Sequence, residues 1–368
     1  MYVSSLIPIS LGSLNPFKQS QLDYDYTDLI YCRFKGQNNF DDRILLVNVK
    51  KPDRTQIAEA IDSLRNYGAA VIGIDVIFEG QKTPEGDSLL SSIIANTPNL
   101  VLSDILNTEL DSFLPHSCDT LFCNQQNVAY VNYVAKPNMS IRYLSPIEEL
   151  NGTKVDAFSS AILRRYAPQK YDSLAGRKNT VEQINYRGGT DSYAQLTIDE
   201  VISNPAVSKT VKDKIVLMGY LGQDEWEMST RDKFFTPLNE ELALRSLPDM
   251  FGLVIHANVI SMMLDNCYIN PSSKMETWLI SIILIFLMVY LFRYFFLTFN
   301  PGYFKAARLV QLTVFFALFL LATLLFYRFH YRLNLSFVLV GVVLSWDIVK
   351  IYQHVFIKKQ KPLRSQKT

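Results

Sequence analysis

The sequence predicts an α/β fold with a mixed, mainly parallel sheet and flanking helices, followed by an all-α membrane segment of three helices. Up to about Asn270, short runs of branched apolar residues alternate with helical patterns, as in parallel crossover units. After Glu276 three long apolar runs dominate the composition. A chain of 368 residues is long enough for one large domain or two ordinary ones.

The clearest crossover unit lies near residue 60. The run RILLVNV (43–49) predicts a buried strand, and residues 52–68 predict a helix that begins at Asp53 and stops at Gly68. The apolar face of this helix consists of Ile57, Ile61 and Leu64. Residues 69–78 predict a second strand. Asp75 therefore lies at a carboxyl strand end, the edge where parallel sheets bind ligands.

The remaining patterns extend the same architecture. Further strands are predicted over 99–104, 127–133, 181–189 and 213–219, and amphipathic helices over 156–167 and 254–266. No repeat and no low-complexity linker interrupts this domain.

The three apolar runs cover residues 277–299, 309–327 and 333–357. The first two are long enough to span a bilayer. The third is weaker because Asp347 and Lys350, three residues apart, follow its uncharged part. We interpret it as a third span whose end reaches the interface; a surface-lying amphipathic helix is the alternative.

Loop charge predicts the orientation. Lysine and arginine are concentrated in the tail, residues 358–368, which the positive-inside rule places in the cytoplasm. Arg328 and Arg332 between the second and third runs count mildly against this. Because three spans are an odd number, the large domain is expected on the outer side.

The first 22 residues form a truncated or atypical N-terminal segment. Their apolar stretch is too short to span a membrane, and no basic residue precedes Lys18. An exported domain needs a signal, so we expect the true start of the chain to lie upstream of Met1.

The charge argues against a nucleic-acid binder, and the cysteine content argues against a structural zinc site. A net charge of +1 argues against a nucleic-acid partner, which would require a clustered basic surface. Cys118 and Cys123, close to His116, lack the fourth ligand of a structural zinc site. They predict a local disulfide if this part lies outside the cell and two free thiols if it lies inside.

The polar residues favour binding over catalysis, and no cofactor is predicted. Nothing brings the candidate carboxylates Asp75, Asp87 and Asp104 together, and no phosphate loop follows the first strand. Arginine suits a carboxylate or phosphate ligand because its planar fork donates two parallel hydrogen bonds. The loops contain Asp75, Glu79, Tyr186, Arg187, Arg231 and Lys233; of these we select Asp75, Tyr186, Arg187 and Arg231 as candidate ligand-binding residues.

His256 stands alone, without a second His, Cys or acidic residue at metal-ligand spacing. A histidine of this kind is usually structural, so no metal site and no catalytic role are predicted for it.

Six segments in order carry a family resemblance: DRTQIAEAIDSLRNYGAAVIGIDVIF, GDSLLSSIIANTPNLVLSD, INYRG, DKIVLMGY, RDKFFTPL and FGLVIHANVISMMLDN. Together they resemble the second class of CHASE domains, extracellular sensory modules of bacterial cyclases and histidine kinases that typically precede about three membrane helices. The resemblance assigns residues 23–271 to such a domain. It also implies that His256 and Asn258 fix the docking of the last helix and couple the domain to the membrane.

The chain departs from the family pattern at Asn48 and Lys50, where an acidic residue is usual, and at Tyr220, where a small residue is usual. MFG also replaces the usual PG before His256. A ligand shared by the family is therefore not carried over to this chain.

The sequence thus predicts a non-enzymatic, multi-pass protein of the bacterial inner membrane, with its large domain periplasmic or extracellular. We expect it to act as a ligand-binding sensor subunit. Its expected partners are membrane lipid, a small-molecule ligand and a separate signalling protein. The alternative is a structural or assembly subunit of a membrane or envelope complex that binds no small ligand.

Overall fold

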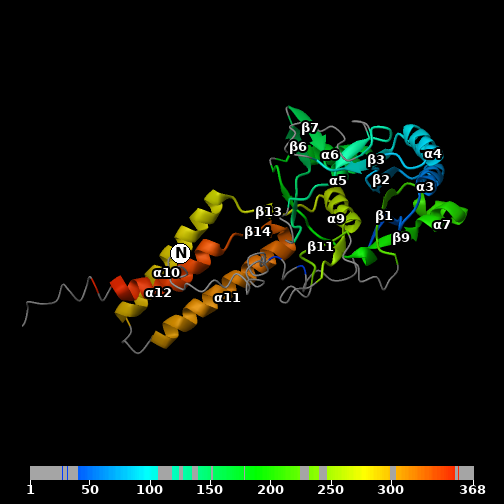
Figure 1. Ribbon diagram of the computed structural model, residues 1–368. Coiled ribbons are helices and arrows are strands. Elements are labelled where there is room, and N and C mark those ends of the chain that lie inside the picture. Colours follow the sequence, from blue (N-terminus) through cyan, green and yellow to red (C-terminus); the bar gives the residue numbers. More distant parts are fainter. Residues whose placement is uncertain are drawn as a thin grey trace, which may run out of the picture. The chain divides into compact units, whose positions relative to one another are not determined.

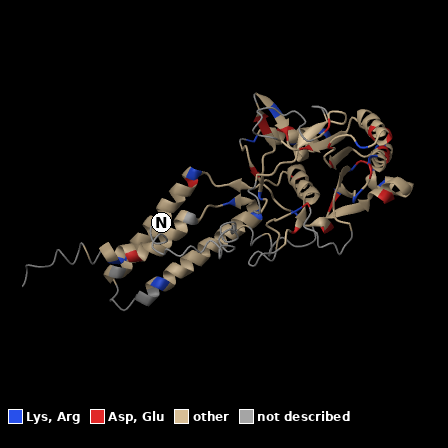
Figure 2. Cartoon of the chain, viewed as in Figure 1, with Lys and Arg blue, Asp and Glu red and all other residues tan. Residues whose placement is uncertain are grey.

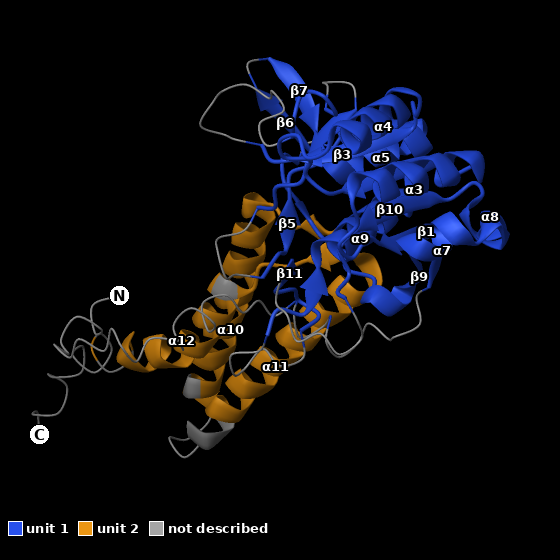
Figure 3. Ribbon diagram, turned by 45° about the vertical axis from the view of Figure 1, so that its right-hand side comes forward, with its two compact units in different colours: residues 1–268 blue, residues 269–368 orange. Residues whose placement is uncertain are grey.

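The computed structural model describes residues 40–106, 118–123, 127–134, 140–150, 152–177, 179–223, 232–239, 247–298 and 304–352, with Thr27, Tyr31 and Val355. The chain divides into two compact units, Met1–Tyr268 and Ile269–Thr368 (Figure 3). The N-terminal segment, Arg231 and the tail 358–368 lie outside the described residues, so the predictions for them are not tested.

A parallel sheet forms the centre of the first unit. Its strands are β1 (Asp41–Asn48), β2 (Val71–Asp75), β3 (Leu100–Asp104), β4 (Val128–Tyr130), β9 (Tyr193–Thr197) and β10 (Ile215–Gly219). Their order is β4-β3-β2-β10-β1-β9, and every neighbouring pair is parallel. β10 comes late in the chain yet lies between β1 and β2, with Leu217 opposite both Leu46 and Gly73.

One face of the sheet is covered by α3 (Arg54–Asn66), α4 (Pro84–Ala95) and α7 (Ile198–Ser203), which share a buried apolar core with the strands (Figure 1). The predicted start of α3 is confirmed. The Asp53 carboxylate accepts the Gln56 N–H at 2.8 Å and the Gln56 side chain accepts the Asp53 N–H at 3.0 Å, which makes a capping box.

The opposite face is covered by α5 (Phe158–Tyr166) and α9 (Gly252–Leu264), and every residue of α9 is buried. Gly73 in β2 permits the close approach of α5. A Cβ atom on Gly73 would lie 2.6 Å from Ile162 Cδ1 and 2.9 Å from Phe158 Cζ. The architecture is therefore three-layered, with helices on both faces of a parallel sheet.

Smaller elements surround this core. They are α6 (Pro168–Ala175), α8 (Ser208–Val211), two 3₁₀ turns (Thr190–Ser192 and Pro205–Val207), and the antiparallel pairs β5 (Tyr143–Leu144) with β8 (Glu182–Gln183), β6 (Ile147–Leu150) with β7 (Thr153–Asp156), and β11 (Lys233–Phe234) with β12 (Met250–Phe251). The strand predicted over 181–189 is wrong in extent, because only β8 forms and it lies outside the main sheet. The edge strand β9 was not predicted.

The second unit contains α10 (Lys274–Thr298), α11 (Phe304–Phe329) and α12 (Ser336–Tyr352), and β13 (Asn270–Pro271) pairs with β14 (Tyr331–Arg332). Two helices, over Lys274–Phe295 and Ala307–Phe329, are long and apolar enough to cross a membrane. Their side chains are largely exposed, unlike those of a soluble core helix; Phe286, for example, is 68% exposed. The described part of α12 has 17 residues, so a third span stays a prediction.

Polar and small residues hold α12 against its neighbours. The Gln311 side chain of α11 donates to the carbonyls of Val342 and Val343 at 3.1 and 2.8 Å. Arg308 lies 2.7 Å from Asp347. Gly341 leaves no room for a Cβ atom, which would lie 2.3 Å from Ile285 Cδ1 of α10. Other charged residues are sparse along these helices (Figure 2).

Candidate functional site

A cleft of about 840 Å³ lies at the carboxyl edge of the sheet. Its walls come from the segments that follow β1, β2, β3, β4 and β10, together with Asp232. It is lined by Val49, Lys50, Lys51, Pro52, Arg54, Ile57, Asp75, Val76, Ile77, Phe78, Glu79, Lys82, Ile105, Val131, Tyr220 and Asp232. Open parallel sheets bind ligands at this edge, and the volume suits a small molecule.

Asp75 is the last residue of β2 and lies opposite Gly219 of β10. Burial and the nearby Asp232 carboxylate raise the pKa of Asp75 to about 7, while the Ser103 hydroxyl on the neighbouring strand acts in the opposite direction. Asp75 is thus a carboxyl group that gains or loses its proton near neutral pH.

The amino terminus of α9 lies beside these carboxylates. A Cβ atom on Gly252 would be 3.8 Å from both Asp75 Oδ2 and Asp232 Oδ1, so both groups approach one point above this glycine. The Gly252 N–H donates to the Asp232 carbonyl at 3.1 Å, and no side chain caps the helix. The partial positive charge of the helix end favours the ionised carboxylates and offsets part of their mutual repulsion.

Asn48 organises the neighbouring loops. Its side-chain oxygen accepts the N–H groups of Lys50 and Leu221 at 3.0 and 3.1 Å, and its amide donates to the Gly222 carbonyl at 2.7 Å. Lys50 consequently adopts a left-handed backbone conformation, with φ 49°. Asn48 thus joins the segments after β1 and β10.

Arg54 lines the cleft but is committed to the protein. Its buried guanidinium pairs with Asp87 and donates to the carbonyls of Glu79 and Gly80. The ring of Phe122 lies 4.7 Å from it. Arg54 therefore fixes the loop after β2 instead of offering a charge to a ligand.

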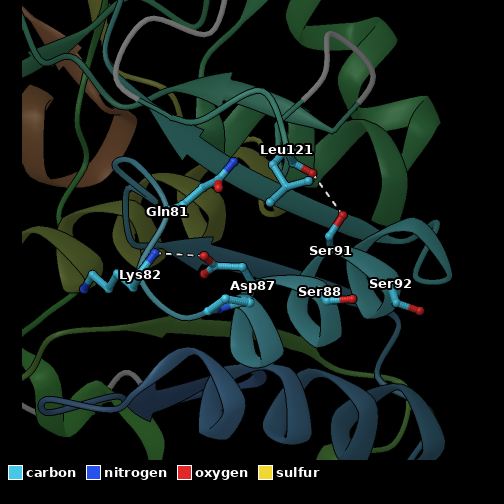
Figure 4. Close-up of a pocket in the computed structure, with 8 residues that line it drawn as sticks. Gln81, Lys82, Asp87, Ser88, Ser91, Ser92 and Leu121 are labelled. Carbon is cyan, nitrogen blue, oxygen red and sulfur yellow. Dashed lines mark hydrogen bonds between the residues drawn. The ribbon is translucent and has the colours of Figure 1, made fainter.

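A second hollow, of about 630 Å³, lies beside α4 (Figure 4). Asp87 accepts the backbone N–H of Lys82 at 2.8 Å, and Ser91 donates to the Leu121 carbonyl at 3.1 Å. The Lys82 side chain extends away from Asp87 (Figure 4). These lining contacts are those of a packed loop.

Cys118 and Cys123 are joined by a disulfide, with their Cα atoms 6.0 Å apart. The enclosed segment packs on the cleft wall. The Asp119 N–H donates to the Phe78 carbonyl at 2.8 Å, and the Phe122 ring lies 5.6 Å from that of Phe78.

His256 and Asn258 lie in α9. Burial lowers the pKa of His256 to about 3, so its ring is neutral. Ser159 Oγ lies 3.1 Å from Nδ1, and the ring stacks on Tyr133 at 5.2 Å. These are contacts of a packed core residue.

Three hydrogen bonds of the Asn258 side chain hold the turn at Arg187 and Gly188 against α9. Its oxygen accepts the N–H groups of Arg187 and Gly188 at 2.6 and 3.2 Å. Its amide donates to the carbonyls of Gly188 and Val254 at 3.0 and 2.9 Å.

The family comparison agrees with this architecture. Residues 11–292 match the family model described as the CHASE2 domain, which is most of the chain. The chain belongs to the CHASE2 family. No curated protein and no solved structure matches it. The CHASE2 domain is an extracellular sensory domain, and the match extends into α10.

Two of the residues selected from the sequence of this CHASE2 domain do not line the cleft. Tyr186 is fully buried and donates its hydroxyl to the Ile141 carbonyl at 2.7 Å. Arg187 pairs with Asp265 and lies 3.7 Å from Asp41, the first residue of β1. Asp41 marks the amino edge of the sheet, so the structure does not bring Arg187 to Asp75. Arg231 lies outside the described residues.

The structure adds residues to the CHASE2 cleft that the sequence alone did not indicate. Asp232, Lys50, Lys51, Lys82 and Tyr220 all line it, and so does Glu79, a loop residue that was named with Asp75 but not selected. Lys233 instead lies over the Phe251 ring, 4.8 Å from its centre. Positions directly after a strand were the available signal for Lys50 and Tyr220. In the described part of the chain, no group of three or more His, Cys, Asp or Glu side chains could hold a metal ion.

Proposed function

We propose that this CHASE2 protein is a membrane-anchored extracytoplasmic sensor subunit. It binds a small molecule in the carboxyl-edge cleft and passes a signal through its membrane helices to a separate protein. The observation that carries the proposal is the cleft itself, which places the Asp75 carboxyl beside the amino terminus of α9. Membership of a sensory-domain family supports the same conclusion.

Helix α9 is the element that would transmit occupancy of the cleft. Its amino terminus lies at Asp75, on the carboxyl edge. Just after its carboxyl end, Asp265 pairs with Arg187 and lies 2.8 Å from Arg43, which in turn pairs with Asp41 at the amino edge. A fully buried helix held at both edges of a sheet moves as a rigid body, and the chain after it continues into α10 at Lys274.

A thermal-shift screen of the full-length chain in lipid nanodiscs against a small-metabolite library tests the proposal. We expect at least one compound to raise the unfolding temperature, and we expect Ile105→Trp, which fills the cleft, to abolish the shift. Leu89→Trp is the matched control, because Leu89 is similarly exposed, on α4, and does not line the cleft. A library without hits, combined with stable copurification of envelope proteins, would instead favour an assembly subunit.

A further inference from the structure

The cleft carries charges of both signs. Its acidic residues are Asp75, Glu79 and Asp232, and its basic residues are Lys50, Lys51, Lys82 and Arg54. Arg54 is neutralised by Asp87. Besides Arg54, three lysines and three carboxylates line the same cleft.

The carboxylate end is suited to a cation. Asp75 Oδ2 and Asp232 Oδ1 each lie 3.8 Å from the position that a Cβ atom on Gly252 would occupy, so two carboxylates gather at this end of the cleft, and a protonated amine is a group that pairs with carboxylates. Within the described part of the chain, no lysine or arginine forms a salt bridge with Asp75. Repulsion between the two carboxylates already disfavours the ionised state of Asp75, and a cation between them would remove that cost.

The lysine end is suited to an anion. Lys50, Lys51 and Lys82 are exposed side chains on the segments that follow β1 and β2, and none of the three forms a salt bridge with a described carboxylate. Ammonium groups at such positions attract carboxylate and phosphate groups as point charges. Asn48 holds the backbone of Lys50, and Asp87 holds that of Lys82, so both lysines start from fixed positions.

A metal ion explains this arrangement less well than an organic cation does. Hard cations require six or more oxygen ligands, and the described residues include no group of three potential ligand side chains. The volume of about 840 Å³ also exceeds what a single ion fills and matches a small metabolite.

We propose that the cleft binds a small zwitterion, whose protonated amine lies between Asp75 and Asp232 and whose carboxylate or phosphate meets Lys50, Lys51 and Lys82. This inference rests on the proposed sensor function and specifies its ligand class. The carboxylates at one end of the cleft would match the amine of the ligand, and the lysines at the other end would match its acidic group.

Calorimetric titration of the full-length chain in nanodiscs tests the assignment. The probes are glycine, glutamate, lysine, 4-aminobutyrate and phosphoethanolamine, together with their N-acetylated forms and with ethanolamine. We expect at least one zwitterion to bind and its N-acetylated form to bind at least tenfold more weakly. We expect Asp75→Asn to weaken binding at least tenfold and the triple change of Lys50, Lys51 and Lys82 to Gln to do the same. The exposed-site controls Asp172→Asn and Lys209→Gln should leave affinity unchanged.

Three outcomes would overturn the assignment. The first is a ligand without an amine that binds equally well to wild type and Asp75→Asn while Ile105→Trp blocks it, which rejects the zwitterion and leaves the sensor function intact. The second is binding of a divalent cation alone, tested with Mg²⁺ and Ca²⁺ and lost in Asp75→Asn. The third is no binding by any zwitterion in the series; if the wider library also gives no hit, the sensor function fails with it.

Discussion

Asp75 lies in an environment that its position in the sequence does not reveal. A carboxylate at a strand end is ordinarily ionised at neutral pH, but here burial and Asp232 raise the pKa to about 7. Asn at this position resembles the protonated carboxyl in shape and in charge. Stability measurements can therefore test the environment of Asp75 without any ligand.

The folded protein binds a proton at Asp75 more tightly than the unfolded chain does, whose carboxyl has the ordinary pKa of 3.8. The resulting stabilisation is fully present below pH 3.8 and is lost as pH rises through about 7. We expect Asp75→Asn to unfold at a higher temperature than wild type at pH 8. The advantage should be a few degrees, from about 1–2 kcal/mol after allowance for solvent screening.

Thermal unfolding of both proteins between pH 5 and pH 8 provides the measurement. The difference between them should grow from pH 5 to about pH 7 and level off above that. Asp172→Asn, at an exposed carboxylate, should show no such trend, and a constant difference for Asp75→Asn would contradict the raised pKa.

Asn258 is the residue for which one substitution should be most costly. Truncation to Ala leaves the N–H groups of Arg187 and Gly188 without their acceptor beneath α9. We expect Asn258→Ala to lower the free energy of unfolding by about 2–3 kcal/mol, as measured by urea denaturation. Asn66→Ala, at an exposed helix end, serves as the control and should change it by less than about 0.5 kcal/mol.

At the scale of elements, the disulfide closes a short segment against the cleft wall. Crosslinks of short loops restrict the unfolded chain only modestly, so we expect Cys118→Ser with Cys123→Ser to cost about 2 kcal/mol. Dithiothreitol should lower the unfolding temperature of wild type by as many degrees as the double substitution does. Cys267→Ser, at a free thiol, should retain the full response to the reductant. An unfolding temperature that does not respond to reductant would show that the segment is held by Phe122 and Asp119 alone.

Elements with strong local signals were predictable from the sequence. The helix α3 has both an apolar face and a cap, and the strands β1, β2, β3 and β10 are continuous apolar runs because both faces of the sheet are covered. The edge strand β9 carries the polar residues Gln195 and Thr197 and is only partly buried, so it has neither signal.

The site was less predictable than the fold, because it combines residues that are distant in sequence. Strand position alone identified Asp75. Asp232 lies near Asp75 only because α9 begins at the carboxyl edge of the sheet. No local sequence pattern predicts where α9 begins relative to the sheet. Arg187 appeared suitable for an anionic ligand, but Asp265 at the far end of α9 holds it.

At the scale of the whole molecule, the number of membrane crossings determines on which side the tail lies. Three spans place it opposite the large domain, and two place both on one side. We expect Ser365→Cys to react with a membrane-impermeant maleimide only after the cells are opened. Asp172→Cys should react in intact cells, and both changes are made in a background that carries Cys32→Ser and Cys267→Ser.

Labelling of both positions in intact cells would show that α12 does not cross the membrane. It would support the alternative, a helix that lies at the surface, and would place the Arg308–Asp347 pair at the interface.

The position of β10 also sets an order of events during synthesis. The strands β1 and β2 cannot join one sheet until β10 pairs with both of them. β10 is synthesised only after most of the first unit has left the ribosome. Until then the nascent chain exposes two unpaired apolar strand edges, which are prone to aggregate. The cleft cannot exist earlier either, because Tyr220 and Asp232, which follow β10, complete it. We therefore expect a chaperone that shields those edges until residue 219 emerges to raise the folding yield of this domain.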